Sequence, residues 1–385
     1  QVLFKNSKQS FLLESGKGPL ETAQFSIFGG SQSRLLKFFK KKAKLYENGK
    51  LKTEFNEITQ AFKILNFESS AIKFNYLPHF WGGWVGFVGY EAGALFEKLP
   101  LTSSKNTPDI SFMEVDNLFV YDHKTKKLKF ILSGNHKIKE TDYDDFILKI
   151  KDIWKDVQRI IKNLSPEYQY IETKRKPFWP VSLKPNLKKK EYINKVNKAK
   201  EYISQGDIYQ ANLSQKFEAN FNSDPFELYQ RLRNVNPSPF SGFLKFDDLV
   251  LVSSSPERLI KISGDKIESR PIAGTRPRSI NLEEDKVLSS ELLLNEKERA
   301  EHLMLVDLER NDLGRLCKMG TVEVTDLMFL EKYSHVSHIV SNISGNLLPN
   351  QEIFDILKAM FPGGTITGCP KIRCMEIINE LEPVE

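Results

Sequence analysis

Residues 296–312, Glu-Lys-Glu-Arg-Ala-Glu-His-Leu-Met-Leu-Val-Asp-Leu-Glu-Arg-Asn-Asp, form the stretch around which the rest of the chain is organised. Read as a helix, it places Glu298, Glu301 and Leu305 on one face. His302 follows on the turn after Glu298, so an imidazole is expected in the same surface patch as the two carboxylates. Oxygen ligands on a rigid element suit a hard cation such as Mg²⁺, which binds one or two carboxylates and completes its shell with water or substrate. The segment therefore predicts a helix with a cation site.

The same segment also has a purely structural interpretation. Lys297 and Arg299 balance the acids, and a solvated charged helix face has the same composition. Taken alone, the stretch favours this simpler interpretation, and only the rest of the chain supports a site.

Composition limits the classes of protein that the chain can represent. Its 385 residues exceed the usual size of one hydrophobic core, which predicts two domains or one large composite domain. Hydrophobic residues make up 40% and charged residues 28%, as in ordinary globular proteins. The formal charge of +6 comes from lysines spread along the chain and would help to attract small anions.

No segment indicates a membrane, a secretory signal or a nucleic-acid module. The apolar runs are too short to cross a bilayer, and the start lacks a signal pattern. The cysteines, Cys317, Cys369 and Cys374, show no metal-type spacing and cannot all pair. The basic run 174–180 around Trp179 is weak evidence for nucleic-acid binding. We expect a soluble, cytoplasmic protein with neither a membrane nor a nucleic-acid partner.

The order of predicted elements indicates an α+β fold with an N-terminal region at 1–172, a linker at 173–190 and a second region at 191–385. The glycine- and aromatic-rich segment 81–90 predicts a tightly packed internal strand. Further predicted elements are a hairpin at 116–132, helices at 192–203, 226–232 and 353–360, a strand at 207–215, and hairpins at 240–254 and 260–268.

Polar groups recur on apolar elements in four separated segments. They are Gln210, Glu257, the Gly274-Thr275 turn with Glu298 and Glu301, and His338 with Gly364-Thr365. The last pair lies in a loop before a helix, where backbone amides can hold an anion. Acids, amide donors and a cation together predict a site for a polyanionic small molecule.

At this point the sequence resembles component I of the chorismate-utilising enzymes anthranilate synthase and aminodeoxychorismate synthase. The segments that carry the resemblance are GDIYQANLSQ at 206–215, SPERL at 255–259, SRPIAGTRPR at 269–278, NEKERAEHLMLVDLERNDLGR at 295–315, YSHVSHIVSNISG at 333–345 and FPGGTITGCPKIRCMEII at 361–378. FLLES at 11–15 and GGWVGFVGYE at 82–91 resemble the family's N-terminal region more loosely. The resemblance implies a large α/β sandwich of two antiparallel sheets flanked by helices, with the site between them.

The resemblance also implies roles for the polar residues. Glu301, with Glu298 beside it, would bind the Mg²⁺ that holds the ring carboxylate of chorismate. Glu257 would be the general acid for the departing 4-hydroxyl, and His338 would assist the step at the ring carbon. The substrate carboxylates would be held by Gly274, Thr275, Gly364 and Thr365.

The nucleophile is inferred from Gln210, which stands where water-using relatives carry a lysine base. Glutamine cannot activate water, which favours ammonia, supplied by a separate glutamine amidotransferase subunit. Ala273 stands where aminodeoxychorismate enzymes often carry a lysine nucleophile, and alanine there is similar to anthranilate synthase. The segments at 212–215, 236–244 and 361–371 are more similar to the aminodeoxychorismate branch, whose product is the leading prediction.

Two further expectations complete the sequence analysis. FLLES resembles a tryptophan-binding motif, which makes Ser15 a candidate feedback contact. The chain begins at Gln1 and ends at Glu385, whereas the family continues with strands that supply a second metal-binding glutamate, so we expect a fragment with weak or absent catalysis. The alternative from another class is a catalytically dead subunit that binds only chorismate or a partner.

Overall fold

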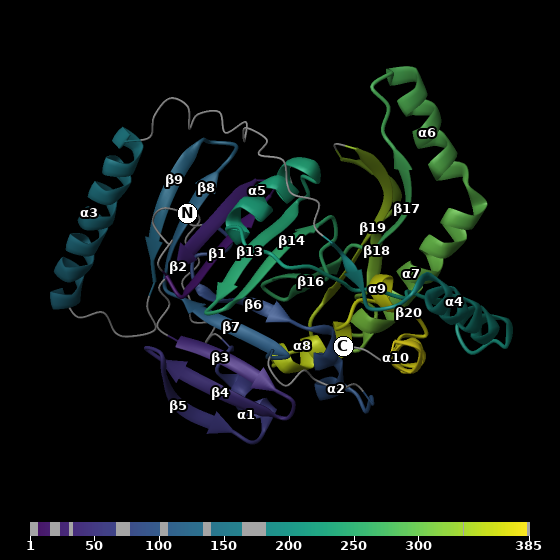
Figure 1. Cartoon of the computed structure of the whole chain (residues 1–385), viewed down its shortest axis with the longest axis horizontal. Helices are drawn as coiled ribbons and strands as arrows, with labels where there is room; N and C mark the ends of the chain where they lie inside the picture. The colour runs from purple at the N-terminus through teal and green to yellow at the C-terminus, as the bar shows by residue number, and fades with distance from the viewer. Residues whose placement is uncertain are drawn as a thin grey trace.

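The computed structural model describes residues 7–15, 24–30, 34–66, 78–100, 107–133, 140–163, 182–333 and 335–382. Across these ranges the strands form three larger antiparallel sheets and two short ladders, with helices around them (Figure 1). The predicted α+β class, with antiparallel sheets flanked by helices, is confirmed.

The first sheet joins strands from the N-terminal region to a hairpin of the second region. Its strand order is β14 (Leu249–Ser255), β13 (Phe240–Phe246), β1 (Gln9–Glu14), β2 (Phe25–Gly30), β8 (Asn117–Asp122) and β9 (Lys127–Leu132). β1 pairs with β13, from Gln9 opposite Phe246 to Glu14 opposite Ser241. Residues 173–181 of the predicted linker 173–190 lie outside the described residues, and the regions on either side of the linker share this sheet.

The second sheet packs face to face on the first. Its order is β5 (Lys50–Phe55), β4 (Lys42–Glu47), β3 (Arg34–Phe39), β7 (Ile110–Val115) and β6 (Gly83–Val88). Phe11 and Phe246 of the first sheet share a buried core with Met113 of the second. The other face of the second sheet is covered by α1 (Ile58–Lys63), α2 (Gly93–Phe96) and α8 (Ile353–Met360), around Phe62 and Phe96.

The segment predicted as an internal strand lies at a sheet edge. Among the strands that the structure describes, β6 pairs only with β7, so the prediction of an internal position was wrong. The close packing inferred from its glycines is confirmed, because a Cβ on Gly86 would lie 2.0 Å from the Ser111 carbonyl oxygen. Gly86 must therefore be glycine because the backbone of the paired strand β7 lies too close for a side chain.

The third sheet carries most of the candidate site. Its order is β15 (Lys261–Ser263), β16 (Lys266–Ser269), β19 (Val336–Asn346) and β17 (Ile272–Pro277), and β18 (Glu323–Lys332) also pairs with β19. The helix α7 (Glu296–Gly314) packs across β17 and β19, and its buried Val306 and Leu313 meet Ile343 and Met360. The quoted helix is therefore central to this half of the molecule.

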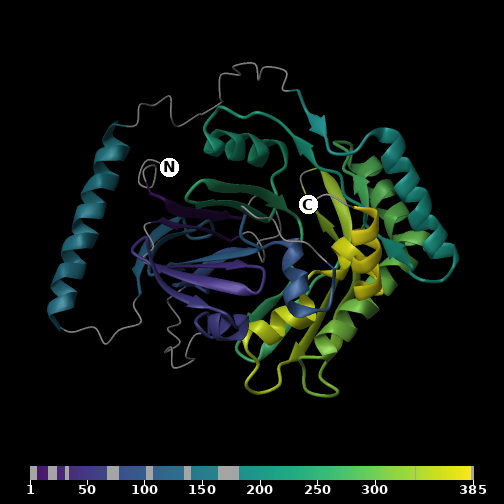
Figure 2. The ribbon, with the colours of Figure 1, turned by 60° about the horizontal axis from the view of Figure 1, so that its bottom comes forward.

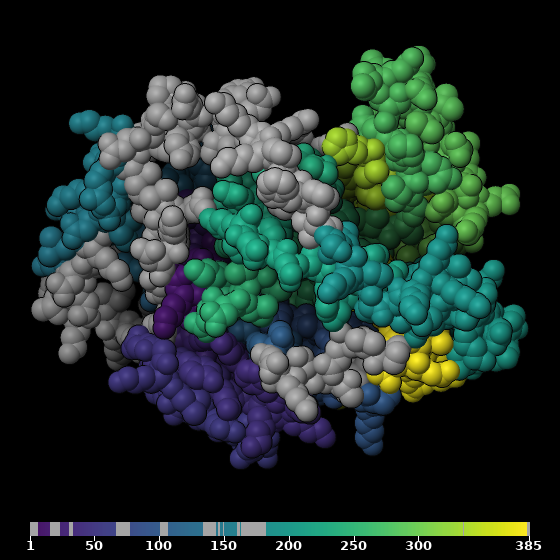
Figure 3. Space-filling view, viewed as in Figure 1, coloured from purple at the N-terminus to yellow at the C-terminus, as the bar shows by residue number. Residues whose placement is uncertain are grey.

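The remaining helices lie on the outside (Figures 1 and 2). They are the 3₁₀ turn η2 (Tyr90–Ala92), α3 (Glu140–Asn163), α4 (Lys189–Ser204), α5 (Pro225–Val235), α6 (Leu282–Leu294), α9 (Gly364–Thr367) and α10 (Lys371–Leu381). α6, green in the space-filling view, projects from the body of the molecule (Figure 3). None of the helices in the described ranges is long and apolar enough to span a membrane.

Two short ladders connect the segment after α4 to other parts of the chain. β10 (Lys184–Pro185) pairs with β12 (Phe217–Glu218), and β11 (Gln210–Ala211) pairs with β20 (Gly368–Cys369). The strand predicted over 207–215 is therefore confined to Gln210–Ala211. Ala199 of α4 and Ile377 of α10 pack together beside this ladder, so the segment is held by helix contacts rather than by a long strand.

Candidate active site

Two carboxylates of α7 lie on the face that the helix period predicts. Asn295 caps the helix, and its side chain accepts from the Glu298 amide at 3.0 Å. Arg276 Nη1 donates to Glu298 at 3.2 Å, and Gln210 Nε2 donates to Glu301 at 3.2 Å. Both acids are partly buried, so the helix brings them together at the edge of the third sheet.

His302 does not join this patch. Its side chain is fully buried, and Nε2 lies 2.6 Å from Ser341 Oγ on β19. Burial lowers the pKa of His302 to about 4, so the ring is neutral at physiological pH. The expectation of a shared surface patch was wrong because this position of α7 faces the sheet.

The oxygen atoms at Glu298 and Glu301 are of the kind that a hard cation binds. The Gln210 Oε1 atom, next to the amide nitrogen that binds Glu301, is buried without a hydrogen-bond partner among the described residues. No group of three or more His, Cys, Asp or Glu side chains that could hold a metal occurs in the described ranges. Glu298 and Glu301 could therefore supply only part of the coordination shell of a cation such as Mg²⁺, which takes one or two carboxylates and completes its shell with water or substrate.

Glu257 is a carboxyl group that is partly protonated near neutrality. It follows β14, and its Oε1 accepts from the Ile272 backbone N–H at 3.2 Å. Burial raises the pKa of Glu257 to about 7, and a charge on Glu309 would add to this increase, while hydrogen bonds from Thr365 and Ile272 oppose it. A partly buried acid with this pKa can donate a proton at pH 7.

His338 lies on β19 directly opposite Thr275 of β17. Its Nδ1 is 2.9 Å from Thr275 Oγ1 and 3.3 Å from the Gly274 carbonyl oxygen. A carbonyl can only accept, which favours the tautomer with the proton on Nδ1 and leaves Nε2 as a base. Burial lowers the pKa of His338, so the neutral ring predominates. Tyr333 packs edge-on against the ring at 5.4 Å between centroids.

The β17 segment that faces His338 is irregular. Its register shifts between Ala273 and Thr275, and Gly274 has a φ of +75°, which favours glycine. A Cβ on Gly274 would also lie 3.0 Å from Glu298 Oε2. Ala273 is buried beside this bulge and offers no nucleophilic atom.

The loop at Gly364-Thr365 reaches the site from the C-terminal part of the chain. Thr365 hydrogen bonds to Glu257 through its side chain and accepts from Asn212 Nδ2 at 2.7 Å through its carbonyl. The Gly364 backbone N–H, predicted to hold a substrate carboxylate, donates to Glu309 in this structure. α9 is a single turn.

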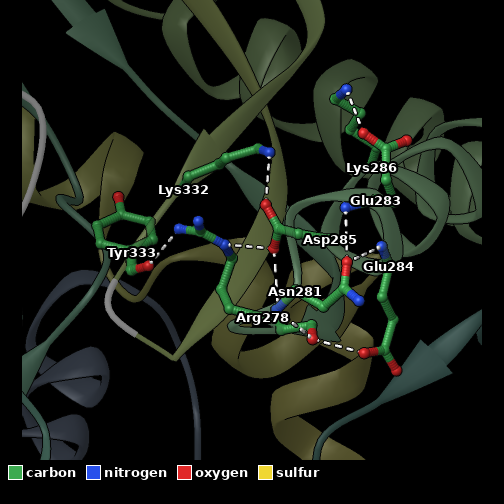
Figure 4. Close-up of polar contacts among 9 residues, drawn as sticks. Arg278, Asn281, Glu283, Glu284, Asp285, Lys286, Lys332 and Tyr333 are labelled. Carbon is green, nitrogen blue, oxygen red and sulfur yellow. Dashed lines mark hydrogen bonds and ion pairs between the residues drawn. The ribbon is translucent and has the colours of Figure 1, made fainter.

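Two groups of residues were missed in the sequence. Glu309 follows Glu298 by three helical turns, so the same helix period could have indicated it. The second group is an ion cluster at the start of α6 (Figure 4), where Asp285 accepts from Arg278 Nε at 2.6 Å and Lys332 Nζ at 2.8 Å. Arg278 Nη1 also donates to the Tyr333 carbonyl at 2.9 Å. No local sequence pattern indicates this second group.

Ser15 directly follows β1. It lines a cavity of about 820 Å³ together with Glu14, His79, Arg258 and Lys261. Glu14 accepts a hydrogen bond from Tyr229 at 2.7 Å. The cavity is large enough for an amino acid.

The comparisons with known proteins agree with the predicted fold and family. The model of the chorismate binding enzyme family matches residues 8–385, so the chain belongs to this family. Anthranilate synthase component 1 of Acetivibrio thermocellus is 38% identical over 99% of this chain and 78% of the relative. Aminodeoxychorismate synthase component 1 of Bacillus subtilis is 42% identical over 84% of this chain and 66% of the relative.

A solved structure gives the same result. Anthranilate synthase component I from Streptococcus pneumoniae superposes with a TM-score of 0.77 and 32% identity, covering 94% of this chain and 77% of that one. The chain spans only 60% of the length of a curated relative from Synechocystis sp.. The predicted family is confirmed, and the two named activities are matched at similar levels of identity.

Proposed function

We propose that this chain is the chorismate-aminating component I of a synthase that takes ammonia from a glutamine amidotransferase partner. The observation that carries the proposal is Glu257, whose pKa of about 7 and contacts with Ile272 and Thr365 suit a general acid. The names of the relatives, component 1 of two synthases, support both the substrate and the partner.

In the proposed reaction ammonia forms a bond to a ring carbon while the 4-hydroxyl departs. Glu257 gives its proton to the hydroxyl, which leaves as water. The new ammonium group then returns one proton to the Glu257 carboxylate, so the acid is restored. His338 faces the ring with a neutral imidazole and assists at the ring carbon.

The proposed magnesium site consists of Glu301 with Glu298 beside it. Mg²⁺ would supply positive charge for the ring carboxylate of chorismate. Gly274 and Thr275 hold the substrate from the β17 side and Thr365 from the α9 side, while the Gly364 N–H is already bound to Glu309. Arg276 neutralises Glu298 in this structure at 3.2 Å, so cation binding would compete with this ion pair.

We propose 4-amino-4-deoxychorismate as the product, on the likeness of the segments at 212–215, 236–244 and 361–371 to the aminodeoxychorismate branch. Anthranilate with pyruvate is the second candidate, and Ala273 favours it. The buried methyl group of Ala273 cannot attack the ring, so ammonia would add directly.

The test incubates the full-length protein with chorismate, Mg²⁺ and ammonium, and separates the products by chromatography. A product that becomes p-aminobenzoate only when a separate lyase is added supports the leading proposal. Fluorescent anthranilate with pyruvate supports the second candidate. Absence of any product, with chorismate binding retained, would favour the binding-only subunit.

The cavity at Ser15 is proposed as a tryptophan site. Titration with tryptophan should show weaker binding to Ser15→Ala than to the wild type. Inhibition by tryptophan should weaken in parallel. Wild-type protein that neither binds tryptophan nor is inhibited by it would remove this proposal.

A further inference from the structure

Glu309 is a buried carboxyl group without a role in the reaction described above. Its side chain is 3% exposed, and Oε2 lies 2.7 Å from Ser269 Oγ at the end of β16. The Gly364 N–H donates to the same carboxyl group, and Oε1 is 3.7 Å from the position of a Cβ on Gly364. Glu309 therefore connects α7, β16 and the loop that carries Thr365.

The hydrogen bonds of Ser269 indicate the protonation state of Glu309. Ser269 Oγ has two neighbours that can accept, Glu309 Oε2 at 2.7 Å and the Leu259 carbonyl oxygen at 3.1 Å. A hydroxyl group has one hydrogen and a backbone carbonyl has none to give. If Glu309 is ionised, one of the two acceptors is left without a proton. If Glu309 is protonated, it donates to Ser269, which donates to Leu259, and all three groups are satisfied.

The charges around Glu309 agree with this assignment. Burial raises the pKa of Glu309, and Asp312 on the same helix raises it further. Lys371 of α10 lowers it, but the Lys371 ammonium is engaged in an ion pair with Asp312. Glu257 faces Glu309 from the segment after β14, and a charge on Glu309 would raise the pKa of Glu257.

We propose that Glu309 is a positioning residue that works as a neutral carboxylic acid, whose proton fixes Ser269 and Leu259 and thereby holds Glu257 and the Gly364 loop at the site. Leu259 is two residues from Glu257, so displacement of its carbonyl would move the acid. The inference rests on the proposed function, because its effect on turnover is read from chorismate amination.

The test compares Glu309→Gln, Glu309→Ala and Ser269→Ala in the full-length protein, with Glu296→Gln on the exposed start of α7 as the matched control. Glutamine keeps one donor for Ser269 and one acceptor for Gly364, so E309Q should keep kcat within about threefold. E309A and S269A should each lower kcat about tenfold or more, and E296Q should leave it unchanged. An E309Q variant as slow as E309A would overturn the proposal.

The pH profile of kcat, at a fixed concentration of free ammonia, separates a neutral Glu309 from an ionised one. If Glu309 is neutral, E309Q leaves the alkaline limb set by Glu257 where it is. If Glu309 carries a charge, its removal moves that limb to lower pH, and the proposal fails.

Infrared difference spectra of wild type against E309Q give a readout independent of turnover. A carbonyl band of a protonated carboxyl at pH 7, absent in E309Q, is the expected result, and a carboxylate band in its place overturns the proposal. Because this measurement needs no substrate, a protein that fails to aminate chorismate would refute the proposed function and leave the protonation of Glu309 tested.

Discussion

At the scale of single residues, burial and the direction of hydrogen bonds decide what the acids of the site can do. Glu257 and Glu309 have raised pKa values because both are withdrawn from solvent. Glu298 and Glu301, only three residues apart on α7, are partly exposed and contact a cationic or amide donor. One helix and one loop thus provide both the proton-holding carboxyl groups and the two carboxylates of the proposed cation site.

Replacement of Glu257 by glutamine should affect activity and stability in opposite directions. Loss of the general acid should lower kcat by about 10²–10⁴-fold. The folded protein holds the Glu257 proton up to a pKa of about 7 against 4.5 for an ordinary glutamate, so the wild type loses stability as pH rises through this window. Each pKa unit corresponds to about 1.4 kcal/mol, so E257Q should be more stable than the wild type by up to about 3 kcal/mol at pH 8.

Urea unfolding of wild type and E257Q at pH 5 and pH 8 measures this difference. Glu323→Gln, an exposed position on β18, serves as the control and should show the wild-type pH dependence. Equal pH dependence in E257Q and wild type would contradict the raised pKa.

At the scale of elements, α6 depends on the cluster around Asp285 for its attachment. Arg278 and Lys332 lower the pKa of Asp285 to about 2, with Arg278 as the larger cause. Arg278 also binds the carbonyl of Tyr333, which precedes the His338 strand, so the cluster joins α6 to the turn between β18 and β19. α6 projects from the molecule (Figure 3), and its other contacts are with β17, β18, β19 and α7.

Asp285→Asn should therefore lower the melting temperature at pH 7. The lowered pKa of Asp285 gives stability that is present above about pH 4 and is lost as pH falls toward 2. D285N should lack this part of the loss of stability at acid pH. Thermal unfolding between pH 2 and 7 is the measurement, and Glu283→Gln, which removes an exposed pair with Lys286, is the control expected to change little. A D285N melting curve equal to that of the wild type at pH 7 would refute this account of α6.

At the scale of the whole molecule, the sequence predicted what is local and missed what is distant. The helix at 353–360 and the turn at Asp247 between β13 and β14 were placed correctly, because period and turn residues are read within a few positions. The pairing of β1 with β13 joins residues more than 200 positions apart, and no local pattern encodes it. For the same reason the candidate site residues could be named from local motifs, whereas Ser269 and Asp285 emerged only from the packing.

The long-range pairing leads to a prediction about the folding unit. Pieces 1–163 and 182–385, produced together with a tag on one piece, should purify as a complex, because β1 fills the place between β13 and β2 and Phe246 enters a core shared with Met113. The second piece produced alone should aggregate, since one edge of β13 and its apolar face are left uncovered.

Leu12→Pro in the first piece removes a backbone donor from a strand paired on both sides and should abolish co-purification, while Glu54→Gln on the edge strand β5 should not. If each piece instead elutes alone as a folded monomer, the regions on either side of the linker are independent domains, and the shared sheet is not what holds the molecule together.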